Sequence, residues 1–414
     1  MMNLTFQKWL KVTFLNLLIV SILGCILRYK FAYSLPVVNM SFLLHGHSHF
    51  AFSGWVSQAL MILMVQYLSE KTSRNEFPRY RWILWANLVS AYGMLFSFPF
   101  EGYATISIIF STGSVFAGYG FAIYFWKDLN RLQGSGPERP FFKAALFFNA
   151  LSSFGPYGLA YFMAHGNSHP RWIEACVYFF LHFQYNGWFL FGCMGLFASR
   201  MPKLERVERR FQVAHYLFAF ACVPAYLLSI LWAPLPSWLY GLAILSGLAQ
   251  LLAWGLMAGV SRKTGYMVQP PLSSFARILL ILCAIAYTIK LSLQAASSLP
   301  SLSHLTFGFR PIIIGYLHLV LLVVVSLFII SYCIAGGYYP ASGYRKKGVV
   351  IFVSGIILNE ILLMIEGIAD LDYHSVPYMN DYLLWAAVII FLGLVLMNLN
   401  WKNPGGSGEI LAAT

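Results

Sequence analysis

Long apolar segments follow one another along almost the whole chain and restrict it to one class of fold. Twelve runs of roughly twenty residues are each long enough to cross about 30 Å of hydrocarbon as a helix. The runs cover approximately residues 9–28, 42–68, 80–100, 104–126, 142–163, 173–198, 211–232, 238–260, 275–296, 311–335, 348–366 and 382–401. We therefore predict one all-α, polytopic membrane domain over residues 1–403 and a flexible tail over 404–414. The first run lacks a cleavage-type small-residue site and is interpreted as a retained signal-anchor.

The amino-acid composition supports a membrane protein. Hydrophobic residues make up 59% of the chain and charged residues only 10%, whereas about a quarter of a soluble domain is charged. This balance excludes a disordered, collagen-like or disulfide-rich secreted protein and argues against a soluble enzyme. The six cysteines lie within or at the ends of the runs without CxxC spacing, and we interpret them as small apolar packing residues.

The chain has a net charge of +13, and the distribution of its positive residues among the loops predicts its orientation in the membrane. Of the 27 lysines and arginines, 22 fall in alternate loops on one side of the runs, four fall on the other side, and Lys290 lies inside a run. Loops rich in lysine and arginine stay in the cytoplasm. We therefore predict twelve transmembrane helices with both termini cytoplasmic, in a bacterial-type inner (plasma) membrane. The positive charge then requires no nucleic-acid partner, and the lipid bilayer is the expected environment.

The histidines concentrate on the predicted outer side. Nine of the ten lie in outer loops or in the outer halves of the runs, and only His215 is near the cytoplasmic end. Ionisable side chains inside a membrane are costly and usually face a bundle interior or a functional cavity. The distribution predicts an outward-facing layer that binds a metal or a haem.

Three runs place histidines at similar depth. In the second run, HGHSH puts His45 and His49 on one helix face and His47 on roughly the opposite face. His182 in the sixth run and His318 in the tenth lie about 12 Å deep at 1.5 Å per residue. Neutral imidazole binds haem iron, copper and zinc. The alternatives are histidines that donate to backbone carbonyls and, for HGHSH, a shallow divalent-metal site or a solvated cluster at the membrane interface.

This pattern resembles the catalytic subunit of haem-copper oxidases, including cbb3-type oxidases and nitric oxide reductases. In that family of twelve-helix bundles, low-spin haem is held by one histidine on helix two and one on helix ten. Here His45-Gly46 before FAFSG resembles the helix-two motif, with His49 as the alternative, and His318-Leu319-Val320 resembles the helix-ten motif. The resemblance implies a bundle like oxidase subunit I with one low-spin haem b. A weaker resemblance is to twelve-helix haem proteins linked to nitric-oxide stress.

The second metal centre of the family is largely missing. His182 before Gly-Trp-Phe-Leu resembles the copper-ligand helix, and we predict it as a metal ligand, with His47 as a second candidate. The family's second helix-ten histidine is replaced by Tyr316, and its helix-seven histidine pair by Ala225 and Tyr226. The resemblance therefore implies neither dioxygen nor nitric oxide reduction, and whether the protein is an enzyme stays open.

Further polar residues lie inside or beside the runs. Glu360 and Glu366 on the eleventh run and Lys290 on the ninth are candidates for a proton or cation path. Lys290 is also expected to pair with Glu366 or a haem propionate, or to extend towards the interface. Arg310 and His304 are the candidate propionate partners, since the loop after the eleventh run is acidic.

Three functions are compatible with these features. The first is a haem-b protein for electron transfer or redox and gas sensing, with quinol, cytochrome c or subunits of a respiratory complex as partners. The second is a transporter or metal-handling protein that uses HGHSH and Glu360. The third is a cofactor-free structural or assembly subunit of a respiratory complex. A reduced-minus-oxidised visible spectrum separates them, because only the first predicts a haem band.

Overall fold

A computed structural model of the chain describes residues 4–166, 169–264, 268, 271–299, 302 and 309–399. Within these ranges all regular secondary structure is helical and no strand is present, which confirms the all-α class. The predicted tail over 404–414 and His304 lie outside the described residues.

The helices follow the apolar runs closely. The first are α1 (Phe6–Ala32), α2 (Met40–His49), η1 (Phe50–Ser57), α3 (Gln58–Thr72), α4 (Phe77–Glu101) and α5 (Thr105–Arg131). Next come α6 (Glu138–Ser152), α7 (Phe154–Ala164), α8 (Pro170–His182), η2 (Phe183–Phe189), α9 (Leu190–Ala198), α10 (Glu205–Cys222) and η3 (Pro224–Ser229). The last are α11 (Ser237–Thr264), α12 (Ser274–Ala296), α14 (Arg310–His318), η5 (Leu319–Ser326), α15 (Leu327–Ala335), α16 (Gly343–Leu371) and α17 (Met379–Asn398).

Among the described residues, nine continuous helices are long and apolar enough to cross a membrane, so the chain is a multi-pass helical membrane protein. Two of the nine, Met40–Thr72 and Arg310–Ala335, each join two α-helical segments through a π-helical one. The other three predicted spans, 142–163, 173–198 and 211–232, coincide with α6 and α7, with α8–η2–α9, and with α10 and η3. The first of them is divided at Ser153 into helices of 15 and 11 residues.

The helix Met40–Thr72 runs through the centre of the bundle. In its most apolar 18-residue window 89% of the residues are buried, against 22% to 50% in the other eight helices. The outer helices instead expose large apolar side chains, such as Phe96 at 65% and Leu245 at 64%. Exposed apolar surface on this scale is what a bilayer covers.

Helices α16 and α17 approach each other through glycines. A Cβ atom at Gly348 would lie only 2.8 Å from the carbonyl oxygen of Gly393, and one at Gly355 would lie 2.9 Å from the backbone nitrogen of Ile390. Helices in membranes commonly use small residues to bring their backbones together. This contact fixes the position of α16, which carries Glu360 and Glu366.

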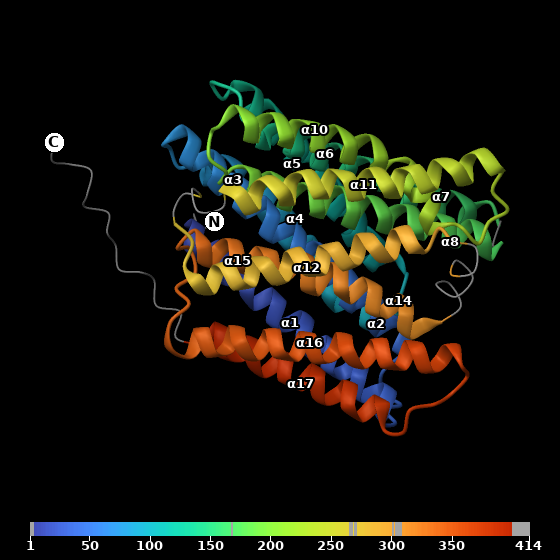
Figure 1. Cartoon of the computed structure of the whole chain (residues 1–414). Helices are drawn as coiled ribbons and strands as arrows, with labels where there is room; N and C mark the ends of the chain where they lie inside the picture. The colour runs from blue at the N-terminus through green and yellow to red at the C-terminus, as the bar shows by residue number, and fades with distance from the viewer. Residues whose placement is uncertain are drawn as a thin grey trace.

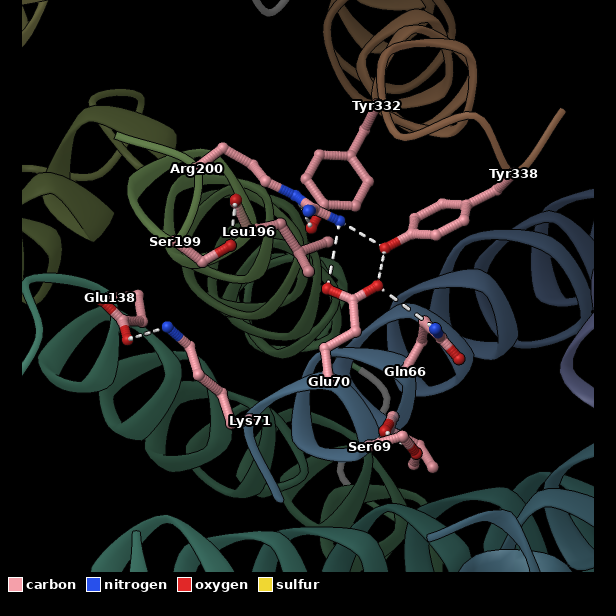
Figure 2. A network of polar contacts seen from close by, with 11 residues as sticks. Gln66, Ser69, Glu70, Lys71, Glu138, Leu196, Ser199, Arg200, Tyr332 and Tyr338 are labelled. Atoms are coloured by element: carbon pink, nitrogen blue, oxygen red, sulfur yellow. Dashed lines mark hydrogen bonds and ion pairs between the residues drawn. The ribbon is translucent and has the colours of Figure 1, made fainter. Parts of the chain in front are cut away.

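One end of the bundle is held by a polar network around Arg200 (Figure 2). The guanidinium lies 3.3 Å from the Glu70 carboxylate and donates from Nε to the Tyr332 hydroxyl at 3.1 Å. The Tyr338 hydroxyl bonds to both Arg200 and Glu70, and Gln66 donates to Glu70. These contacts connect α3 with the ends of α9 and α15. In Figure 1, α3 and α15 lie towards this end, whereas α2, α8 and α14 lie towards the other.

Candidate functional site

Three of the candidate histidines, one in each of three runs, directly precede a π-helical segment. η1 begins after His49, η2 begins after His182, and η5 begins after His318. π-helical turns are rare and occur frequently at functional sites. Two of the three share a sequence spacing, HFAFSGW at 49–55 and HFQYNGW at 182–188. This repeated spacing of histidine, phenylalanine, glycine and tryptophan is a signal that the analysis of single motifs missed.

The three π-helical segments are joined by buried tryptophans. Trp55 of η1 donates from Nε1 to the Ser326 hydroxyl of η5 at 2.8 Å. Trp188 of η2 donates to the Ser57 hydroxyl of η1 at 3.0 Å. All four side chains are buried, with Trp188 at 0% and Trp55 at 2% exposure. The two hydrogen bonds therefore connect the three helices that carry the histidines, at positions that follow the histidines in the chain.

The first cluster consists of His47, His318 and Arg28, which are close enough to influence one another electrostatically. His318 lies within electrostatic range of both His47 and Arg28. The His47 ring donates a hydrogen bond to the Val20 backbone carbonyl on α1, and a Cβ atom at Gly24 would lie 3.5 Å from its Cε1. The Nδ1 atoms of both imidazoles and one guanidinium nitrogen of Arg28 are buried without a hydrogen-bond partner. Buried polar atoms without partners are uncommon in proteins, and a bound ligand or ion is one explanation for them.

His45 and His49 lie on the other side of α2. The His45 ring is 4.6 Å from the Tyr103 ring, and its Nε2 is 3.3 Å from the Ser41 hydroxyl. His49 Nε2 is 2.9 Å from the Tyr103 hydroxyl, and its ring stacks on Phe98 at 4.4 Å. Both histidines thus contact α4 and the loop after it. The sequence places His45 and His49 on one face and His47 on the other, and in the structure it is His47 that interacts electrostatically with His318.

Arg28 connects this cluster to α16. It lies within electrostatic range of Glu360, Glu366 and Arg310. Glu360 accepts a hydrogen bond from Asn359 at 3.2 Å. Arg310 lies over the Phe31 ring at 4.9 Å, which keeps its charge at the same end of the bundle as Arg28. The predicted propionate partner Arg310 therefore lies near Arg28, at the same end of the bundle.

Glu366 also borders an open cavity at the end of α16. The cavity measures about 350 Å³ and lies between α1, α16 and α17. Its lining includes Glu366, Asp370, His374 and Asp381. The Glu366 carboxyl group therefore borders an open cavity with other ionisable side chains.

Lys290 belongs to a second cluster around His182, with partners other than Glu366. Its ammonium donates to Asn186 Oδ1 at 2.6 Å and to Gln294 Oε1 at 2.5 Å. His182 Nε2 is 2.8 Å from the Cys222 carbonyl oxygen, and its Nδ1 is 3.1 Å from the Asn186 amide. Both ring nitrogens are therefore engaged by the protein.

Aromatic rings lie close to His182 and to its neighbour Tyr185. The rings of His182 and Tyr226 are 6.0 Å apart, and those of Tyr185 and Tyr316 are 6.3 Å apart. Among the described residues, no group of three or more histidine, cysteine or acidic side chains could hold a metal ion. Hydrogen-bonding and aromatic side chains surround His182 instead.

Comparisons with known proteins add no assignment. No protein-family model matches the chain, and no curated protein matches it either. The resemblance to haem-copper oxidases therefore depends on the motifs in the sequence.

Proposed function

We propose that the chain is an integral membrane haem-b protein, similar to haem-copper oxidases, that carries one low-spin haem between α2 and α14. His47 and His318 would be the axial ligands, so the ligand on α2 is reassigned from His45 or His49. The observation that carries this proposal is that two imidazoles from separate helices, each with a buried, unpartnered Nδ1, both lie close enough to Arg28 to interact with its charge.

The side chains at this site have the chemistry that a haem requires. Imidazole is a common axial ligand of haem iron, and two imidazoles from separate helices give a six-coordinate, low-spin centre. Arg28 and Arg310 would bind the two propionate carboxylates. When bound, the haem supplies one-electron transfer. Glu360 and Glu366 lie close enough to Arg28 to interact with its charge, and we propose that they form a proton or cation path beside the site.

The protein would act in electron transfer or in redox and gas sensing. Tyr316, Ala225 and Tyr226 stand where terminal reductases carry ligands of the second centre, so we propose no reduction of dioxygen or nitric oxide. We further propose twelve spans with both termini cytoplasmic, in a bacterial-type plasma membrane. Quinol, cytochrome c or other respiratory subunits would be its redox partners.

A reduced-minus-oxidised visible spectrum of the purified protein tests the proposal. We expect a haem b band that is lost in His47→Ala and His318→Ala. The matched controls, His45→Ala and His49→Ala, change the same helix on its opposite face and should keep the band. Absence of a band in the wild type, or a band unchanged in His318→Ala, would refute a haem at this site. Zinc or copper binding that depends on His45 and His49, without a visible band, would instead favour metal handling. No cofactor at all would favour a structural subunit.

A further inference from the structure

Lys290 occupies an enclosed site made of groups that bind cations. It is fully buried at 0% exposure in the middle of the bundle. Its ammonium contacts two amide oxygens, of Asn186 and Gln294, and lies 5.8 Å from the centre of the Tyr287 ring. Among the ion pairs of the described residues, none joins Lys290 to a carboxylate. Amide oxygens and an aromatic face are partners of a small cation.

The lysine fixes which atoms donate and which accept in the hydrogen bonds that link it to His182. A protonated lysine can only donate, so the Asn186 oxygen faces it and the Asn186 nitrogen faces His182. His182 Nδ1 must then accept, and the proton of the ring is on Nε2, which donates to the Cys222 carbonyl. No lone pair of this imidazole remains for a metal ion.

The hydrogen bonds on the other side of Lys290 follow the same order of donor and acceptor, away from the lysine. The Gln294 oxygen accepts from the lysine, and its nitrogen donates to Gln250 Oε1 at 3.4 Å. Gln250 and Gln294 are 4% and 7% exposed. The chain of hydrogen bonds therefore joins α11, α12, η2, α8 and the end of α10 around a single ammonium.

We propose that the Lys290 ammonium is a tethered cation that takes the place of the second metal ion in the His182 pocket. The resemblance to haem-copper oxidases implies copper or non-haem iron there, and the residues present do not fit it. His182 has no free lone pair, and the ammonium would repel a metal ion in the same enclosure. The pocket is thus a site for a primary ammonium group, independent of whether haem is bound near His318.

Chemical rescue tests this assignment. Lys290→Ala removes a propylammonium-sized group, so we expect the melting temperature in detergent to fall by about 5–10 °C. Added n-propylammonium should restore at least half of that loss. Propan-1-ol matches its size without the charge, and tetramethylammonium has the charge without N–H donors, so neither should rescue. The control Lys30→Ala removes a lysine that donates to the Leu35 carbonyl, and n-propylammonium should not change its melting temperature.

Metal analysis gives a second measurement that does not depend on the fold of the alanine variant. The wild type and His182→Gln are incubated with Cu²⁺ or Zn²⁺, desalted and assayed for both metals. We expect the same metal content in the two proteins. One equivalent of copper or zinc in the wild type that is lost in His182→Gln would overturn the proposal. Equal rescue of Lys290→Ala by propan-1-ol, or a melting temperature equal to that of the wild type, would also overturn it. The assay counts copper and zinc only, so it is unaffected if the haem proposal fails.

Discussion

The hydrogen bond from Trp55 to Ser326 should couple the helix that carries His47 to the helix that carries His318. Trp55→Phe removes the indole N–H, while Ser326→Ala removes the hydroxyl that accepts it. The Ser326 hydroxyl also donates to the Leu321 carbonyl, so the phenylalanine variant leaves it with one bond instead of two. The two substitutions therefore report on one shared contact.

The size of the effect follows from burial and distance. Both side chains are 2% exposed and the bond is 2.8 Å long. Hydrogen bonds between side chains in membrane helices contribute about 0.6 kcal/mol on average and up to about 1.7 kcal/mol. The smaller phenylalanine ring also leaves a void beside Phe14, which packs edge-on against Trp55 at 5.9 Å. We expect Trp55→Phe to lower the free energy of unfolding by about 2–3 kcal/mol, with about 0.5–1.5 kcal/mol shared with Ser326→Ala.

A double-mutant cycle measures the shared part. The wild type, both single variants and the double variant are unfolded with a denaturing detergent in mixed micelles, and helix content is followed by circular dichroism. The control cycle pairs Ser326→Ala with Trp385→Phe, because Trp385 is 64% exposed on α17. That pair should be additive. If Trp55→Phe and Ser326→Ala also add within about 0.3 kcal/mol, the bond does not couple the two helices.

Three further outcomes can be measured by thermal unfolding. Gly348→Ala should destabilise the contact between α16 and α17 by about 1–3 kcal/mol. The control Gly255→Ala, with open space around its Cβ position, should be neutral or slightly stabilising. Equal effects of the two substitutions would exclude close packing as the cause. Asp128→Asn should cost about 1–3 kcal/mol, because the buried carboxylate accepts from Tyr80 at 2.7 Å and pairs with an arginine at 2.7 Å; an unchanged melting temperature would contradict this. Arg200→Lys should lower the free energy of unfolding by about 0.5–1 kcal/mol. A lysine has a single ammonium group and cannot bond to Glu70, Tyr332 and Tyr338 at once. An effect as large in 1 M salt as in low salt would contradict an ionic origin.

Most of the secondary structure could be predicted from local sequence. Apolar runs of about twenty residues predict helices because a buried backbone must satisfy its own hydrogen bonds. The run at 142–163 is an exception, since α6 ends at Ser152 and α7 begins at Phe154. Hydropathy is averaged over many residues, so it does not detect a break of one residue.

The choice among the three clustered histidines could not be predicted. The helical period separates His47 from His45 and His49 without saying which side meets the bundle. That choice depends on α1 packing near Gly24 on one side and on Phe98 and Tyr103 packing on the other. These contacts join residues far apart in the chain.

The partner of Lys290 was also beyond the sequence. A buried lysine in a membrane predicts a partner, and Glu366 was the expected carboxylate. The amides of Asn186 and Gln294 take that role instead, while Glu366 lies near Arg28. Several polar groups were available at similar depth, and only the packing of α12 against η2 selects between them.

The sequence by itself determined that this is a helical membrane protein. Each apolar side chain contributes a favourable free energy of transfer from water to lipid, and the sum over one segment depends on that segment alone. It also predicted that His182 and His318 lie at similar depth, because depth follows from position along a helix. Only the tertiary structure decided that His47 is the histidine of α2 that interacts electrostatically with His318, that His182 is hydrogen-bonded through both nitrogens, and that an ammonium is buried near it. Those outcomes depend on which helix faces touch, and that is set by packing between segments distant in sequence.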